Sequence, residues 1–201
     1  MANDTHIEIS DGNVFITGQT GAGKTVLLNN FIVDLLKNNN ANDLNLFLVD
    51  VKNIVFPPYE GISHLVGKKP IYTLEEFKTA VDFLLEEIKL RKKSKLANPR
   101  IILIADEFID FTLQEPALEK KLIKIAQKGN RCGVFLVLST QNNMRLKHRR
   151  KLLKVFPCRV YFKDYFGKKE RSLTSDLQPY EYLLVNKNSG QTLRARENIS
   201  T

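Results

Sequence analysis

The chain alternates between short apolar runs and longer segments in which apolar residues recur at helical spacing. The runs that predict strands lie at 14–16, 44–49, 101–105, 134–138 and 159–162, followed by shorter ones at 182–185 and 192–194. The segments that predict helices lie at 26–36, 74–93 and 116–128. Strands that alternate with helices predict an α/β fold with a mostly parallel central sheet and helices on both faces.

Directly after the first strand comes the sequence Gly18-Gln19-Thr20-Gly21-Ala22-Gly23-Lys24-Thr25, which fits the phosphate-binding pattern G-x-x-x-x-G-K-[S/T]. Its glycines allow successive backbone N–H groups to surround an anion, and the helix that begins near Val26 adds partial positive charge. We expect Lys24 to reach the β- and γ-phosphates of ATP and the Thr25 hydroxyl to ligate Mg²⁺. The alternative is a glycine-rich turn that binds nothing, but strand, loop and helix follow in the required order.

Polar residues end three further strands of the predicted sheet. Asp106 and Glu107 follow one apolar run in a Walker B pattern, and Asp50 and Gln141 end two others. The carboxyl ends of parallel strands share one edge of the sheet, so these side chains are expected to converge on the nucleotide. We expect Asp106 to hold Mg²⁺, Glu107 to orient and deprotonate the attacking water, and Gln141 to sense the γ-phosphate. The alternative for the acidic pair is an ordinary turn after a strand.

Phosphoryl transfer is strongly accelerated by an arginine that meets the γ-phosphate, and Arg131 is the candidate for this role. It lies at the start of the strand that ends at Gln141, which is too far from its own nucleotide. It could serve the nucleotide of a neighbouring subunit, and that role requires a ring of subunits. A solvated arginine at a helix–strand connection is the alternative, and the sequence leaves both open.

The length of 201 residues and the hydrophobic content of 43% suit a single domain, predicted to span residues 1–201. The formal net charge of +9 indicates a polyanionic partner, either nucleic acid or an acidic membrane surface. Cys132 and Cys158 lack metal-type or redox-type spacing, and the N-terminus lacks a signal-peptide pattern, so a cytoplasmic location is expected. No apolar run approaches transmembrane length, so any membrane attachment would come from another segment or an accessory protein.

Several motifs together resemble the FtsK/SpoIIIE DNA translocases of the HerA–FtsK superfamily. They are D-V-K at 50–52, Y-E-G-I-S-H-L at 59–65, D-E-F-I-D at 106–110, A-Q-K at 126–128, the run 133–141 that ends in T-Q, and F-P-C-R-V at 156–160. The resemblance covers residues 14–185 and implies a RecA-like P-loop NTPase that forms a hexameric ring and pumps double-stranded DNA by ATP hydrolysis. The membrane-anchor, N-terminal DNA-binding and winged-helix regions of larger members are not among the 201 residues. We therefore expect a compact motor from a mobile element, plasmid or virus, or an excised motor core.

A basic segment at 144–154 follows Gln141 and contains six Lys or Arg residues and no acidic residue. In the resembled family this loop faces the pore of the ring. The residues expected to contact the phosphates of duplex DNA are Arg145, Lys147, Arg149, Arg150 and Lys151. Such contacts bind DNA without reading its sequence. The alternative is a solvated basic helix face, with the DNA contacts on Lys163, Lys168 and Lys169.

Three other functions remain open from the sequence. A HerA-like helicase or a viral genome-packaging ATPase would share these motifs, and DNA unwinding would distinguish the helicase. A small kinase or GTPase is disfavoured, because the segment 186–189 (N-K-N-S) lacks the aspartate that reads guanine and the Asp-Glu pair favours attack by water. A DNA-binding protein without hydrolysis is disfavoured by the intact Lys24, Asp106 and Glu107.

Overall fold

The computed structural model describes residues 7, 12–141, 147–163 and 172–197 of the chain. The α-helices are α1 (Lys24–Asn38), α2 (Leu74–Ser94), α3 (Ile109–Gln114), α4 (Ala117–Lys128) and α5 (Arg149–Val155). The strands are β1 (Val14–Thr17), β2 (Leu44–Asp50), β3 (Arg100–Asp106), β4 (Val134–Thr140), β5 (Cys158–Phe162), β6 (Glu181–Asn186) and β7 (Gln191–Arg196). Short 3₁₀ turns are η2 (Pro57–Tyr59), η3 (Val66–Lys68) and η4 (Asn130–Cys132).

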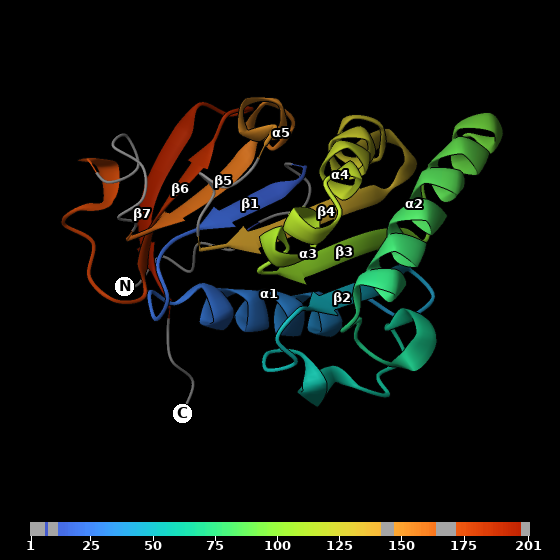
Figure 1. Ribbon diagram of the computed structural model, residues 1–201, viewed down its shortest axis with the longest axis horizontal. Coiled ribbons are helices and arrows are strands. Elements are labelled where there is room, and N and C mark those ends of the chain that lie inside the picture. Colours follow the sequence, from blue (N-terminus) through green and yellow to red (C-terminus); the bar gives the residue numbers. More distant parts are fainter. Residues whose placement is uncertain (1–6, 8–11, 142–146, 164–171, 198–201) are drawn as a thin grey trace.

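The strands form one sheet in the order β2-β3-β4-β1-β5-β6-β7 (Figure 1). The strands from β2 to β5 in that order are parallel, and β6 and β7 extend the sheet as an antiparallel hairpin. β1 lies in the middle, with Thr17 opposite Thr140 on β4 and opposite Tyr161 on β5. The mostly parallel sheet predicted from the sequence is confirmed. The loop that follows β1 therefore begins at the centre of the sheet.

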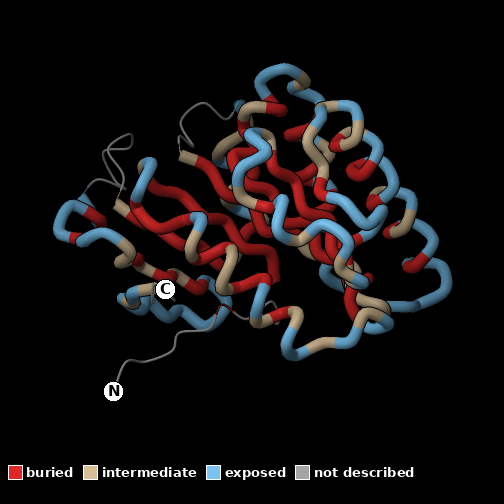
Figure 2. Tube along the Cα trace, turned by 90° about the horizontal axis from the view of Figure 1, so that it is seen from below, coloured by how far each residue is buried: buried red, intermediate tan, exposed pale blue. Residues whose placement is uncertain are grey.

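Helices cover both faces of the sheet, as the sequence predicts: α1 lies on one face, and α2 to α5 lie on the other (Figure 1). Successive residues of β3 fill the two layers alternately. Leu103 belongs to the core beneath α2 and α4, whereas Ile102 and Ile104 belong to the core beneath α1. Burial therefore follows the strands, while the outer sides of the helices are exposed (Figure 2). Strands covered on both faces need apolar residues at every position, which explains their unbroken apolar runs.

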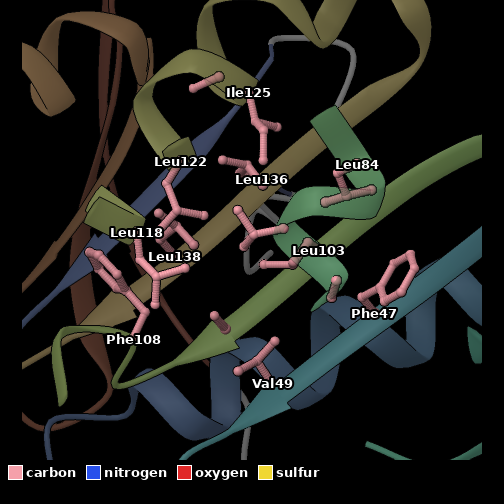
Figure 3. Packing of buried hydrophobic residues seen from close by; sticks show 14 of the residues in the cluster. Phe47, Val49, Leu84, Leu103, Phe108, Leu118, Leu122, Ile125, Leu136 and Leu138 are labelled. Atoms are coloured by element: carbon pink, nitrogen blue, oxygen red, sulfur yellow. The ribbon is translucent and has the colours of Figure 1, made fainter. Parts of the chain in front are cut away.

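The core beneath α2 and α4 is made of interlocking aliphatic and aromatic side chains (Figure 3). The strands contribute Val49, Leu103, Leu136 and Leu138, and the helices contribute Leu84, Leu118, Leu122 and Ile125. Phe108 lies at its edge, immediately after the end of β3. This packing fixes the carboxyl ends of β3 and β4 relative to each other.

Most predicted elements begin and end close to the expected residues. Thr73 and Glu76 form a capping box at the start of α2. The sequence analysis missed α3, because this helix has six residues and no side-chain hydrogen bond caps its start. It also left α5 unassigned, because Leu152 is the only buried residue among its seven, so its apolar periodicity is weak.

Both cysteines, Cys132 and Cys158, are buried, and neither forms a disulfide. They pack as small apolar side chains. In the described part of the chain, no helix combines the length and the apolar character needed to cross a membrane.

Asn13 joins three elements at the end of the sheet opposite the carboxyl ends of its parallel strands. Its side chain is completely buried. Its Nδ2 donates to the carbonyl oxygens of Ala126 on α4 (3.0 Å) and Val155 on α5 (3.4 Å), and its Oδ1 accepts from the backbone N–H of Leu136 (2.8 Å). One amide side chain thus satisfies backbone groups of α4, α5 and β4 that would otherwise be buried without these partners.

We expect Asn13→Ala to lower the free energy of unfolding by about 2–4 kcal/mol, because it leaves a buried N–H and two buried carbonyls short of partners. Urea unfolding measures this change. The matched control is Asn38→Ala, which removes an exposed asparagine whose Nδ2 bonds to the carbonyl of Asp34 at the end of α1. The control should stay within about 0.5 kcal/mol of wild type. An Asn13→Ala protein as stable as the control would contradict the role of Asn13.

Candidate nucleotide-binding site

The loop 18–23 connects β1 to α1 at the carboxyl edge of the sheet, where the sequence places the phosphate-binding segment. Gly23, just before α1, has a left-handed backbone (φ 112°), which favours glycine. A Cβ atom at Gly18 would lie 2.4 Å from the Cβ of Phe162, so only glycine fits there. The backbone N–H of Gln19 donates to the carbonyl of Lys163 (2.8 Å), which ties the loop to the end of β5. Local chemistry and close packing therefore fix this loop.

Lys24, the first residue of α1, is buried under the loop. Its ammonium donates to the carbonyl oxygens of Gly18 (2.8 Å) and Gln19 (3.0 Å). The Nζ atom also lies 3.8 Å from Oε1 of Glu107. The lysine therefore holds a positive charge between the loop and the end of β3, where the sequence analysis expects phosphates.

Asp106 and Glu107 end β3 at the same edge, and both are more than nine-tenths buried. Burial is the largest influence on each carboxyl and raises the pKa of both Asp106 and Glu107. The positive charge of Lys24 lowers both pKa values and partly offsets this effect. Two buried carboxyl groups beside one ammonium form a site that is costly to leave without a cation or polar ligand.

The surroundings of Asp106 fit a bound Mg²⁺. Among the described residues, no group makes a hydrogen bond to its buried Oδ1 atom. Thr25, the other expected ligand, is exposed in the first turn of α1. A carboxylate oxygen and a hydroxyl are hard oxygen donors of the kind that Mg²⁺ prefers, together with phosphate oxygens.

Glu107 has a strained backbone. Its φ angle of 50° lies in the left-handed region, which costs a non-glycine residue about 1 kcal/mol. Its Oε2 atom accepts a hydrogen bond from the backbone N–H of Gln141 (3.0 Å), and the side-chain Oε1 of Gln141 accepts one from the hydroxyl of Thr20 (2.9 Å). These bonds link the Walker B glutamate, the end of β4 and the phosphate-binding loop.

Asp50 lies at this edge, as expected, but its carboxylate is bonded to the chain that follows β2. It is level with Asp106 in the register of β2 and β3. Its carboxylate accepts hydrogen bonds from four backbone N–H groups that follow β2, those of Lys52, Ile54, Val55 and Phe56. Asp50 therefore fixes the loop after β2.

Arg131 lies in η4, at the amino end of β4, and is exposed. The seven residues of β4 place it one strand length, roughly 20 Å, from Gln141. The turn that carries it is held from inside by Arg91, whose buried guanidinium donates to the carbonyls of Cys132 (3.0 Å) and Pro99 (2.6 Å). Its position at the opposite end from the phosphate-binding loop is as expected from the sequence.

The basic segment is described only from Lys147 onward, and Arg145 lies outside the described residues. Lys147, Arg150 and Lys151 are exposed at or near the start of α5, and Arg149 is partly exposed beside them. Of the alternative DNA contacts, Lys163 follows β5, and Lys168 and Lys169 lie outside the described residues. Arg159 is buried and donates to the carbonyls of Phe156 and Leu153 at the end of α5, so it serves the fold.

Tyr180 borders the site and was missed by the sequence analysis. Its backbone N–H donates to the carbonyl of Ala22 (3.0 Å). A Cβ atom at Gly23 would come within 3.0 Å of its Cα and Cδ1 atoms. The segment before β6 thus packs directly against the phosphate-binding loop. No local motif marks this contact, because it joins residues more than 150 positions apart.

Comparison with known proteins gives related sequences over most of the chain. Residues 2–97 match the model of the FtsK/SpoIIIE family. The chain is 30% identical over 161 residues to the DNA translocase FtsK of Corynebacterium efficiens, covering 64% of this chain and 17% of that protein. It is 30% identical over 151 residues to the DNA translocase SftA of Bacillus subtilis, covering 63% of this chain and 15% of that protein. The chain thus spans less than a fifth of these relatives.

Solved structures show the same fold. EssC (ATPases 2 and 3) from Geobacillus thermodenitrificans superposes with a TM-score of 0.79 at 18% identity, over 96% of this chain and 41% of that one. The genome packaging NTPase B204 from Sulfolobus turreted icosahedral virus 2 superposes with a TM-score of 0.65 at 17% identity, over 94% of this chain and 99% of that one. The P-loop ATPase fold is therefore confirmed. The sequence matches and the motifs together show that the chain is similar to the FtsK/SpoIIIE family.

Proposed function

We propose that the chain is the motor of an ATP-hydrolysing DNA translocase that forms a ring and moves duplex DNA. The observation that carries the proposal is the meeting of Lys24, Asp106 and Glu107 beside the phosphate-binding loop. Gln141 joins them through its hydrogen bonds to Glu107 and Thr20. This is the set of groups that phosphoryl transfer to water requires: an anion cradle, a cation, a metal ligand and a base.

Each group has a distinct part in the proposed reaction. Lys24 and the N–H groups of residues 18–26 bind the triphosphate of ATP, and Asp106 and Thr25 would hold Mg²⁺, which would supply positive charge beside the phosphates. Glu107 orients the attacking water and accepts its proton, and the raised pKa of Glu107 makes it a stronger base. Gln141 senses the γ-phosphate from the end of β4.

The exposed Arg131 supports assembly into a ring, which we propose to be a hexamer. Its distance from Gln141 prevents it from reaching its own nucleotide, and its turn is held in place by Arg91. A head-to-tail arrangement of subunits brings such a residue to the nucleotide of a neighbour, and head-to-tail contacts close into rings.

The partner that fits the basic segment is double-stranded DNA. Lys147, Arg149, Arg150 and Lys151 lie close together in sequence at the start of α5, with Arg145 preceding them in the chain. The curated relatives are DNA translocases, which favours DNA over an acidic membrane surface as the polyanion.

We propose a plasmid, viral or other mobile-element setting in the cytoplasm, with any membrane or accessory protein supplied by other chains. A viral genome-packaging ATPase is the second candidate, because the packaging NTPase B204 is matched over almost its whole length. A GTPase is disfavoured further, since Oδ1 of Asn186 accepts from the N–H groups of Asn188 (2.9 Å) and Ser189 (3.3 Å) and so shapes the β6–β7 turn.

The catalytic assignment predicts different results for two substitutions. Lys24→Ala should abolish ATP binding, because the cation under the phosphates is removed. Glu107→Gln should bind ATP and lower the hydrolysis rate by about 100-fold or more, because the base is removed while Asp106 remains. Equilibrium ATP binding and steady-state phosphate release measure these effects. Glu115→Gln, on the connection before α4, is the matched control and should hydrolyse ATP normally. A Glu107→Gln variant with wild-type turnover would remove Glu107 from the mechanism.

If Arg131 acts on the nucleotide of a neighbouring subunit, ATPase activity per subunit should rise with protein concentration. Arg131→Ala should be inactive alone, and mixing it with Lys24→Ala should restore part of the activity, because some interfaces then pair an intact Arg131 with an intact site. The rate of phosphate release from the mixture measures this. Lys128→Ala removes an exposed charge near the same turn and should behave like wild type. Absence of recovery from variants that still assemble would exclude Arg131 as the trans-acting arginine.

The DNA assignment predicts that Arg149→Ala/Arg150→Ala weakens duplex binding about equally for all sequences. The slope of log affinity against log salt should fall by about one for each phosphate that the variant no longer neutralises. Fluorescence anisotropy with unrelated duplexes at several salt concentrations measures both. Lys92→Ala/Lys93→Ala, two exposed charges at the far end of α2, is the control. Unchanged affinity would mean that α5 is a solvated basic face, and a weakening that depends on sequence would mean base readout.

A further inference from the structure

A buried carboxylate lies outside the nucleotide site and holds the start of the basic helix α5. Glu119, in the first turn of α4, is 2% exposed. Its Oε1 accepts a hydrogen bond from the backbone N–H of His148 (2.5 Å), and its Oε2 accepts one from that of Lys147 (3.1 Å). The Nδ1 atom of His148 lies 3.5 Å from Oε2. A buried carboxylate is tolerated only with such partners, so these bonds fix the start of α5 on α4.

The other end of α5 is tied to the same body. Arg159 donates to the carbonyls of Leu153 and Phe156, and Nδ2 of Asn13 bridges the carbonyl of Val155 to that of Ala126 at the end of α4. The basic helix is therefore clamped to α4 at both ends. Displacement of α5 by a bound polyanion must move α4 or break one of these buried contacts.

A second buried glutamate holds the chain just before the basic segment. Glu107 accepts the backbone N–H of Gln141, and only five residues separate Gln141 from Lys147. Glu107 also lies near Lys24, and in the proposed reaction the same carboxylate contacts the attacking water, so we expect its bond to Gln141 to respond to the nucleotide. The bonds of Glu119 go to Lys147 and His148 and do not compete with catalysis.

We propose that Glu119 is a positioning residue that couples DNA binding at α5 to ATP hydrolysis. It fixes Lys147 and His148 on α4, so that α4 and α5 respond as one body to a change at Glu107 and Gln141. This inference rests on the proposed function. A purely structural role would instead lower DNA affinity and both ATPase rates together.

The test compares Glu119→Gln with Glu115→Gln, which removes the same charge from a glutamate four residues earlier that is not buried. In Glu119→Gln the amide NH₂ faces an N–H donor of Lys147 or His148, so one hydrogen bond is removed and the clamp loosens. We expect the melting temperature to fall, because a buried N–H loses its acceptor, while the duplex affinity and the ATPase rate without DNA, measured well below that temperature, stay close to those of the control. Stimulation of the ATPase by saturating duplex DNA should fall by about five-fold or more.

Retained stimulation would overturn the proposal, and so would a decrease in stimulation that parallels a decrease in DNA affinity or in the ATPase rate without DNA. A wild-type protein whose ATPase ignores DNA would instead refute the proposed function and leave the binding role of the basic segment to the affinity measurement. These two failures are therefore distinguishable.

Amide hydrogen exchange on the wild-type protein tests the proposed role of Glu119 even if Glu119→Gln fails to fold. The amides of Lys147 and His148 should stay protected both without nucleotide and with Mg²⁺ and a non-hydrolysable ATP analogue. The protection of the Gln141 amide should change between the two states. Rapid exchange at Lys147 and His148 in either state would overturn the proposal, because the clamp would then not hold.

Discussion

The structure depends on burying negative charge at the carboxyl edge of a sheet. Asp106 and Glu107 are forced into a low-dielectric position because β3 is covered on both faces, and burial raises the pKa of each carboxyl. Lys24 and the N–H of Gln141 offset part of that cost. Among the described residues, no group makes a hydrogen bond to the buried Oδ1 of Asp106, and Glu107 has a left-handed backbone. Both features cost free energy locally.

The sheet supports these features because its central strands cannot move independently. β1 lies between β4 and β5, and the phosphate-binding loop is bonded to the ends of both, through Gly18 to Thr140 and through Gln19 to Lys163. The carboxylate of Asp50, at the same edge, accepts hydrogen bonds from the loop after β2 and fixes that loop. The site is therefore left with two acidic residues and one lysine, a ratio that favours binding of a metal together with an anion.

The parts of the fold and site that local chemistry sets were predictable from the sequence. The phosphate-binding loop and the Asp106-Glu107 pair lie in short motifs with fixed spacing, and the apolar runs predict strands covered on both faces. Asn13 and Glu119 escaped prediction, because their partners are distant in sequence and nothing in their neighbourhoods marks them. Asn13 follows Asp11 and Gly12 in a segment that is typical of a turn. Glu119 lies in a segment that is typical of the first turn of a helix. Only the packing of α4 against α5 reveals that both are buried.

The two glutamates that hold the chain around the basic segment differ in what competes for them. In the proposed reaction Glu107 contacts the attacking water, so its bond to Gln141 is expected to respond to the nucleotide. Glu119 bonds to the backbone N–H groups of Lys147 and His148, and its burial makes those bonds costly to break. In the proposed coupling, the variable contact receives the change at the end of β4, and the fixed contact makes α5 respond together with α4. If both contacts were variable, α5 could move independently of α4, and if both were fixed, the end of β4 could not respond to the nucleotide.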